Sequence, residues 1–341
     1  MEPPVFLLRM GGAYFEPTVA QTASIDMVQS MANLTRPRPL RKPFVVTKMG
    51  QLLRVVRESH EMPMTGVSRS PERVTADELG VTFIGHSSFL LQIDGKNILI
   101  DPVLSKRLIV LRRLRRPGVA AEQMPPIDLV LVTHAHMDHL DIASLRQVIR
   151  STAELAGRMP EVVVPNGVED LVSHLRFARV HRMEWWQRLR VKGLEITMTP
   201  CRHWGARMFN DTHRGYGGYV IEGGRHTVYH SGDTAYFSGF AEIGRRLNPQ
   251  VALLPIGAYS PDSYRAVHTS PEEAVQAFRD LGAESMVPMH FGTFRLGREP
   301  MHEPVDRLRA EARRLGISDQ VRVLGEGETM RVSAPSASYS A

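Results

Sequence analysis

The stretch that most constrains this chain is residues 131–141, LVTHAHMDHLD, where three histidines and two aspartates fall within eight residues directly behind an apolar run. The apolar run reads as a buried strand, and residues two apart in an extended chain face the same way. His134 and His136 are therefore expected to project together from its end, with Asp138 and His139 in the turn before the next helix. Imidazoles and carboxylates at this density suit Zn²⁺ and are too rich in nitrogen for Mg²⁺ or Ca²⁺.

Further potential ligands stand at the ends of apolar strands far along the chain. His203 follows LEITMTPCR, Asp233 follows TVYHSG and His290 follows SMVPM. Each of these residues alone has an ordinary explanation as a satisfied core or loop residue. Together with the HAHMDH motif they make seven ligand-type side chains at strand ends, which is what two adjacent metal ions would require.

Short strands joined by tight turns are expected on either side of the motif. Residues 81–102 read as three strands, and the Asp94-Gly95 pair is a strong signal for the second turn, a hairpin turn. A second hairpin is expected within GGYVIEGGRHTVYHSGD, with its turn at Gly223-Gly224. His230 is expected to lie in the last strand of that hairpin.

Amphipathic helices are expected between the strands. The clearest has Ser270 as its N-cap and Pro271 at its first helical position, while Glu273 completes a capping box and Gly282 ends the helix. The expected helices are residues 141–155, 167–177, 269–282 and 303–316, and further strands are expected at 162–165 and 320–324. Strand pairs that alternate with helices indicate an α/β protein with mixed sheets.

Length and composition indicate a globular protein with a substantial core, since 43% of the 341 residues are hydrophobic. Residues 1–77 are expected to form a partly irregular N-terminal extension, residues 78–333 the main domain, and residues 334–341 a flexible tail. No apolar run approaches the ~20 residues of a membrane-spanning helix, and the N-terminus lacks a secretory signal pattern. A cytoplasmic location is therefore expected. The single cysteine, Cys201, excludes an intramolecular disulfide and leaves histidine and carboxylate as the metal ligands.

Two arginine-rich segments concentrate the formal charge of +6, namely RPRPLRK (36–42) and KRLIVLRRLRR (106–116). Apolar residues are interleaved in the second. Such segments attract phosphate-bearing partners, either nucleic acid or anionic lipid headgroups. A merely solvated basic face is the alternative interpretation.

The ligand pattern resembles the metallo-β-lactamase fold superfamily, with HAHMDH (134–139), His203, Asp233 and His290 in the right order. More narrowly, GHSSFLLQIDGKNILIDPVLSKR, RHWGAR, HSGDTAYF and PMHFGTF resemble the branch that contains N-acyl-phosphatidylethanolamine-hydrolysing phospholipase D and its bacterial relatives. The resemblance covers about residues 78 to 325 and finds no clear match in the N-terminal extension. It implies a four-layer αββα sandwich, with the metals at one edge between the sheets.

The resemblance also implies a ligand set for two zinc ions, with iron or manganese as possible replacements. The implied ligands of the first ion are His134, His136 and His203, those of the second are Asp138, His139 and His290, and Asp233 bridges both.

Three residues outside this set have both a functional and a structural interpretation. Asp101 ends the strand KNILIDP, where it is placed to orient a ligand imidazole or simply to form the turn before proline. His86 in GHSS and His268 in VHTSP match family positions near the substrate, and a core or capping role is the alternative. His268 is further a candidate for binding a phosphate oxygen or assisting the leaving group, and Asp233 for positioning the attacking hydroxide.

Hydrolysis is the expected chemistry, because paired metal ions lower the pKa of a shared water and stabilise the oxyanion of the substrate. The hypothesis is a dinuclear zinc phosphodiesterase of phospholipase D type that acts on a lipid-like substrate. A lactonase or other ester hydrolase, an RNA-processing nuclease and a metal-free binding module remain as alternatives. Trp185, Trp186 and Trp204 could form an apolar wall for an acyl chain or belong to the core.

The expected partners follow from this hypothesis and from the basic segments. They are a small-molecule or lipid substrate and an anionic membrane surface in peripheral contact. Nucleic acid is disfavoured, because no large inserted domain for RNA is visible between the ligands. The sequence does not specify the oligomeric state.

Overall fold

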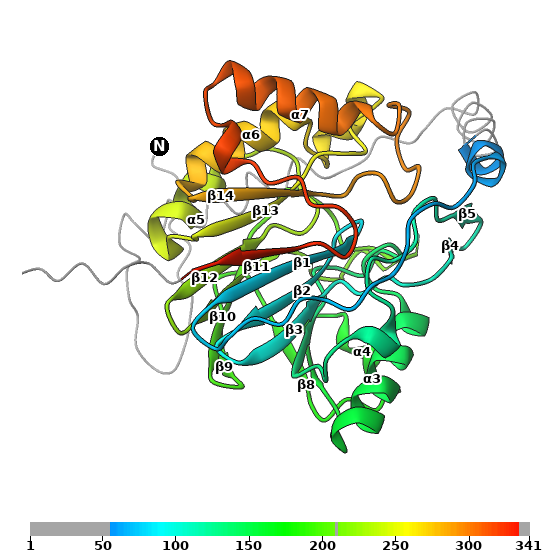
Figure 1. The fold of residues 1–341 in the computed structure, drawn as a ribbon, viewed down its shortest axis with the longest axis vertical. Coiled ribbons are helices and arrows are strands. Elements are labelled where there is room, and N and C mark those ends of the chain that lie inside the picture. Colours follow the sequence, from blue (N-terminus) through cyan, green and yellow to red (C-terminus); the bar gives the residue numbers. More distant parts are fainter. Residues whose placement is uncertain (1–54, 209–210, 334–341) are drawn as a thin grey trace, which may run out of the picture. The chain divides into compact units, whose positions relative to one another are not determined.

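The computed structural model describes residues 55–208 and 211–333, all of which belong to one unit (Figure 1). Two β-sheets face each other in this unit and helices cover both outer faces. The basic segment 36–42, the tail 334–341 and most of the expected extension 1–77 lie outside the described residues, and the domain boundary at residue 77 stays a prediction.

The first sheet has seven strands in the order β15-β1-β2-β3-β6-β7-β8. Their bounds are β1 Leu79–Gly85, β2 Ser88–Ile93, β3 Lys96–Ile100, β6 Leu129–Leu131, β7 Glu161–Pro165, β8 Val180–Met183 and β15 Thr329–Val332. The strands from β15 to β3 pair antiparallel, and those from β3 to β8 pair parallel.

The second sheet has six strands in the order β14-β13-β12-β11-β10-β9. Their bounds are β9 Arg188–Val191, β10 Leu194–Thr199, β11 Gly218–Gly223, β12 His226–His230, β13 Val251–Pro255 and β14 Ser285–Met289. A separate two-stranded ribbon is formed by β4 (Arg107–Leu108) and β5 (Leu111–Arg112).

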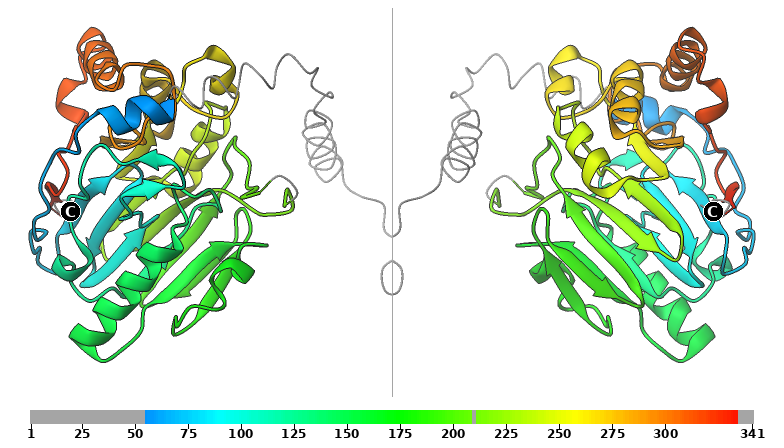
Figure 2. Two further views of the ribbon diagram at one scale, coloured as in Figure 1. Left: turned by 90° about the vertical axis from the view of Figure 1, so that its right-hand side faces the viewer. Right: turned by 90° about the vertical axis from the view of Figure 1, so that its left-hand side faces the viewer.

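Helices complete the layers. Their bounds are α3 Ile142–Ala156, α4 Glu169–Val172, α5 Gly239–Leu247, α6 Pro271–Leu281 and α7 Glu303–Arg314, with short 3₁₀ turns at Ala121–Gln123, Asp262–Ala266 and Ser318–Gln320. Residues 55–61 are also helical. In the views of Figure 2 the green α3 lies at the bottom and the orange α7 at the top, with the sheets between them. None of the described helices is long and apolar enough to cross a membrane.

Strand periodicity explains how the layers pack. On β2, Phe89 and Leu91 enter the core between the two sheets, whereas the intervening Leu90 faces the core beneath α3. A third core joins the second sheet to α5, α6 and α7. The predicted α/β fold, with four layers in the order αββα, is confirmed.

The best-marked elements of the sequence form as predicted. Ile93 pairs with Lys96, so Asp94-Gly95 make the two-residue turn, both with positive φ. α3 and α6 follow the predicted segments, and α6 has the expected capping box at Ser270. The second hairpin turns one residue later than predicted, because Gly223 is still paired with His226.

Two segment predictions were wrong. The helix expected over 167–177 is only α4, because the chain must next enter β8 and the amide of Ala178 already donates to Pro160 O. The strand expected over 320–324 is reduced to an isolated bridge between Val321 and Met286. The last strand is instead β15, which pairs with β1.

Candidate metal centre

The candidate ligands come together because the strands before them end at shared sheet edges. β3 and β6 are parallel, so Asp101 and the HAHMDH loop (residues 134–139) leave the first sheet at one edge. In the second sheet β12, β13 and β14 are parallel, and β10 runs the same way because β10 and β12 both pair antiparallel with β11. His203, Asp233 and His290 therefore leave the second sheet at a common edge.

Three imidazoles, His134, His136 and His203, form the first group. Nε2 of His134 lies 2.9 Å from Nδ1 of His136, and Nε2 of His203 lies 3.2 Å from the same atom. Two nitrogens on one tetrahedral zinc ion lie about 3.3 Å apart, given Zn–N bonds of about 2.0–2.1 Å. Burial lowers the pKa of all three imidazoles, so they are neutral and offer lone pairs, as metal ligands must.

Hydrogen bonds at the far side of these rings fix their orientation. Nδ1 of His203 donates to Val267 O at 2.9 Å. The Thr133 hydroxyl donates to Asp101 Oδ2 at 2.6 Å and therefore accepts from Nδ1 of His134, which lies 2.9 Å away. Both contacts place the proton on Nδ1 and leave the Nε2 lone pair facing the group.

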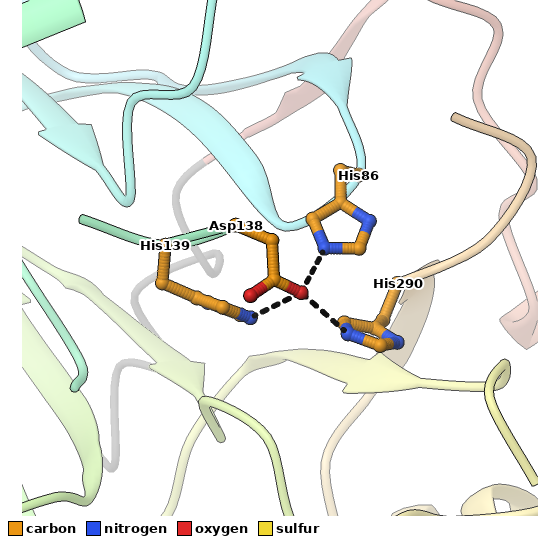
Figure 3. A group of neighbouring side chains, drawn as sticks. All are labelled: His86, Asp138, His139 and His290. Carbon is orange, nitrogen blue, oxygen red and sulfur yellow. Dashed lines mark hydrogen bonds and ion pairs between the residues drawn. The ribbon is translucent and has the colours of Figure 1, made fainter. Parts of the chain in front are cut away.

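The second group gathers His86, Asp138, His139 and His290 around one carboxylate oxygen (Figure 3). Asp138 Oδ2 lies 3.1 Å from Nε2 of His86, 3.6 Å from Nε2 of His290 and 3.8 Å from Nε2 of His139. The other ring nitrogen of His139 lies 2.7 Å from Asp101 Oδ2. Asp101 thus contacts a predicted ligand of each group, one directly and one through a hydroxyl.

Asp233 lies between the two groups. Its Oδ2 is 3.0 Å from Nε2 of His290 and 3.3 Å from Nε2 of His139. The same carboxylate also clusters with His134, a member of the first group. Asp233 therefore lies close to members of both groups.

Buried charges are balanced in this site by histidines. Burial raises the pKa of the Asp233 carboxyl, but the charges of His139 and His290 outweigh burial and hold it well below its usual value. Burial likewise lowers the pKa of His290, but Asp233 and Asp138 raise it to about 9. His139 has its pKa raised well above the usual value, because three carboxylates outweigh its burial. A bound cation would take over the role of these two protonated imidazoles.

Unpartnered atoms support a metal site as well. Several buried nitrogen and oxygen atoms in the two groups lack a hydrogen-bond partner among the described residues, and they are His86 Nδ1, His136 Nε2, His139 Nε2, Asp233 Oδ1 and both ring nitrogens of His290. Buried polar atoms are normally satisfied. A set of imidazoles and carboxylates with this many unpartnered polar atoms fits metal ions, and its nitrogen content favours zinc.

His86 and His268 occupy different places around the centre. His86 is buried within the second group and is itself a potential ligand, whereas the sequence indicated a place near the substrate. His268 is partly exposed at the rim, with Nδ1 3.8 Å from Asp233 Oδ2. Burial lowers the pKa of His268 to about 4.

Arg207 is a site residue that the sequence analysis did not identify, although it ends the noted RHWGAR segment. Its Nη1 donates to Ala135 O at 2.7 Å and to Leu140 O at 2.9 Å. Ala135 lies within the HAHMDH loop and Leu140 directly follows it, so one guanidinium joins that loop to the segment after His203.

The three tryptophans do not form one wall. Trp204 is 49% exposed and its ring meets His136 edge-on at 4.4 Å. Trp186 packs into the core beneath α5 and α6, with Arg246 stacked over it. Trp185 is exposed and donates to Tyr216 O. Only Trp204 has a ring contact with a ligand histidine.

The sequence matches the family model of the β-lactamase superfamily domain over residues 96–291. This chain belongs to the β-lactamase superfamily. The predicted membership is confirmed, and the chain is a metal-dependent hydrolase with the metallo-β-lactamase fold.

Individual superfamily members extend the comparison. A UPF0173 metal-dependent hydrolase of Methanopyrus kandleri is 34% identical over 73% of this chain and 98% of its own length. The mitochondrial N-acyl-phosphatidylethanolamine-hydrolyzing phospholipase D of Saccharomyces cerevisiae is 30% identical over 70% of this chain and 53% of its own length. Among solved structures, the metallo hydrolase Igni18 of Ignicoccus hospitalis superposes with a TM-score of 0.58 at 27% identity, over 75% of this chain and 99% of its own.

Proposed function

We propose that this superfamily member is a dinuclear zinc-dependent phosphodiesterase of phospholipase D type that acts on a lipid-like phosphodiester. The observation that carries the dinuclear site is the position of Asp233, which is close to ligands of both groups. One carboxylate shared between two ligand sets is what a pair of metal ions needs. The substrate class is supported by the similarity to proteins named N-acyl-phosphatidylethanolamine-hydrolyzing phospholipase D.

Each group would hold one ion. The first ion would be bound by His134, His136 and His203, the second by Asp138, His139 and His290, and Asp233 would contact both. When bound, the zinc ions would supply hydroxide from water at neutral pH and polarise the phosphoryl group of the substrate. Iron or manganese would be accepted by the same donors.

The chain's own residues would orient the reactants. The unpaired Oδ1 of Asp233 is placed to hold the attacking water by a hydrogen bond. His268, at the rim and near Asp233, is neutral at neutral pH because its pKa is lowered to about 4, and it is placed to donate a hydrogen bond to a phosphate oxygen or to the leaving-group oxygen. The exposed ring of Trp204 offers an apolar surface beside the first group for the organic part of the substrate.

Metal analysis and a substrate panel test this proposal together. Purified protein reconstituted with zinc should bind close to two ions per chain, and N-acyl-phosphatidylethanolamine in detergent should be cleaved to release phosphatidic acid. The chelator-treated protein should be inactive. Asp233→Asn should abolish turnover by removing the shared ligand, whereas Asp94→Asn in the exposed β2–β3 turn should leave it intact.

The outcomes separate the two parts of the proposal. Hydrolysis of lactones or RNA without cleavage of any lipid phosphodiester would reject the substrate class and keep the metal site. Failure to retain zinc after reconstitution would reject the metal site itself.

A further inference from the structure

The β4–β5 ribbon carries an unusual tip. Arg107 pairs with Arg112 and Leu108 with Leu111, which leaves Ile109 and Val110 as the two-residue turn. Their side chains are 73% and 48% exposed. Ile109 also has φ +51, a conformation that a turn normally assigns to glycine or asparagine. An exposed β-branched residue at this position is unfavourable for solvation and for the backbone, which makes the tip a candidate for a functional contact.

The base of the ribbon is firmly packed, so the tip is held in place. Leu108 shares a small core with Val103 and Phe294. The amide of Arg113 donates to Lys106 O at 2.9 Å, and the amide of Arg112 donates to the Ser59 hydroxyl. In Figure 1 the ribbon lies at the right-hand margin, beyond the ends of both sheets.

The segment that carries the tip is positively charged. Residues 102–121 contain no aspartate or glutamate, and Lys106, Arg107 and Arg116 are exposed. The surface is smaller than the run of arginines in the sequence indicated, because Arg113 is buried. Its guanidinium donates to Val103 O and to Arg115 O and lies over the Phe294 ring.

We propose that this ribbon tip docks the protein on an anionic lipid bilayer. Ile109 and Val110 would enter the boundary between headgroups and acyl chains, while Lys106 and Arg107 would contact the headgroup phosphates. Nucleic acid would satisfy the basic residues but would leave the aliphatic pair in water. Only an apolar medium ringed by negative charge complements both features of the tip.

Docking in this orientation would bring the metal centre to a lipid substrate, a benefit that rests on the proposed function. The Phe294 ring that packs on Leu108 also meets the His86 ring edge-on at 5.4 Å. The ribbon base is therefore one side chain away from the second ligand group. A docked protein would hold its metal centre close to the bilayer that contains the lipid substrate.

Vesicle co-sedimentation of the full chain tests the docking without requiring turnover. Binding should occur on phosphatidylcholine vesicles that contain phosphatidylglycerol and should fall on pure phosphatidylcholine or at high salt. The pair Ile109→Ser and Val110→Ser should weaken binding at least about tenfold. The pair Lys106→Ser and Arg107→Ser should weaken it about 25-fold, since each basic residue at the surface contributes about fivefold.

Matched variants on α3 serve as controls. Leu155→Ser removes an equally exposed aliphatic side chain, and Arg146→Ser with Arg150→Ser removes the same charge. Both should bind like the unaltered chain. All variants should keep their thermal stability and their activity on a soluble phosphodiester, so a failure of docking is distinguishable from a failure of the proposed chemistry.

Three results would overturn the docking. They are equal binding to neutral and anionic vesicles, unchanged binding after loss of Ile109 and Val110, and binding of RNA that depends on Lys106 and Arg107 while vesicles are not bound.

Discussion

Asp101 Oδ2 lies 2.7 Å from Nδ1 of His139, and both side chains are fully buried. The same oxygen accepts a hydrogen bond from the hydroxyl of Thr133, and this hydroxyl also contacts Nδ1 of His134. A single carboxylate therefore orients one histidine in each ligand group. Such contacts set the tautomer and the direction of a ligand lone pair.

Asp101→Asn should consequently weaken zinc binding and activity by roughly 10–100-fold, because the amide keeps the volume but not the charge. Chelator competition measures the affinity directly. Thr133→Val, which replaces the hydroxyl by a methyl group, should weaken the first ion more than the second, because Asp101 keeps its direct contact with His139. Unchanged affinity in Asp101→Asn would show that the ligands are held without this carboxylate.

Zinc uptake should release protons. The metal-free site keeps His290 protonated at neutral pH, since its pKa is raised to about 9, and the pKa of His139 is also raised by the neighbouring carboxylates. A metal ligand must be deprotonated, so protons compete with zinc below these pKa values and the affinity should rise with pH up to about 9. Calorimetry in buffers of different ionisation enthalpy measures the proton count. A pH-independent affinity between pH 6 and about 9 would contradict the charge balance derived from Asp138 and Asp233.

His268 should matter for turnover and little for metal content. His268→Ala is expected to lower kcat by about 100-fold, the usual effect of removing one positioned hydrogen-bond donor to developing negative charge. Zinc stoichiometry, measured on the same sample, should stay at the unaltered value. Loss of zinc in this variant would instead make His268 a ligand, as its cluster with Asp233 and His290 permits.

Arg207 should stabilise the HAHMDH loop. Arg207→Met removes two charge-assisted hydrogen bonds, to Ala135 O and Leu140 O, and should lower the free energy of unfolding by about 2–3 kcal/mol. Thermal denaturation with and without zinc measures this loss. Arg202→Met, an exposed arginine on the same segment, is the control and should change little.

The parts of the centre that follow local rules could be predicted from the sequence. The HAHMDH loop, His203, Asp233 and His290 each follow an apolar strand, and the strand directions bring those ends together. The family resemblance supplied their division between two ions, which stays a prediction, and it did not include His86, which lies in the second group.

Residues whose environment depends on distant contacts could not be predicted in this way. Arg113 belongs to a uniformly basic run, and its burial depends on Phe294, far along the chain. His86 reaches Asp138 only because the turn between β1 and β2 faces the second sheet. The end of the helix near residue 172 was set by the start of β8, which local periodicity does not reveal.

One buried carboxylate, that of Glu299, holds the start of the loop that leads to His268. Glu299 accepts the amides of Ala258 and Ser260, at 2.6 and 3.2 Å, at the start of the loop. At the end of the same loop, the carbonyl oxygen of Val267 accepts a hydrogen bond from Nδ1 of His203. Glu299 therefore holds the segment that both orients a ligand and carries His268.

Glu299→Gln should disturb this loop. Each carboxylate oxygen of Glu299 accepts one backbone N–H, and in glutamine one of these oxygens is replaced by an NH₂ group, which is a donor and cannot accept that hydrogen bond. We expect kcat to fall more than KM changes, and the affinity of the first ion to fall while that of the second is kept. Glu284→Gln, on the partly exposed end of the second sheet, is the control. Equal weakening of both ions in Glu299→Gln would indicate a general loss of folding. Wild-type kinetics would show that other contacts, such as that of Tyr259 with Glu303, are enough to hold the loop.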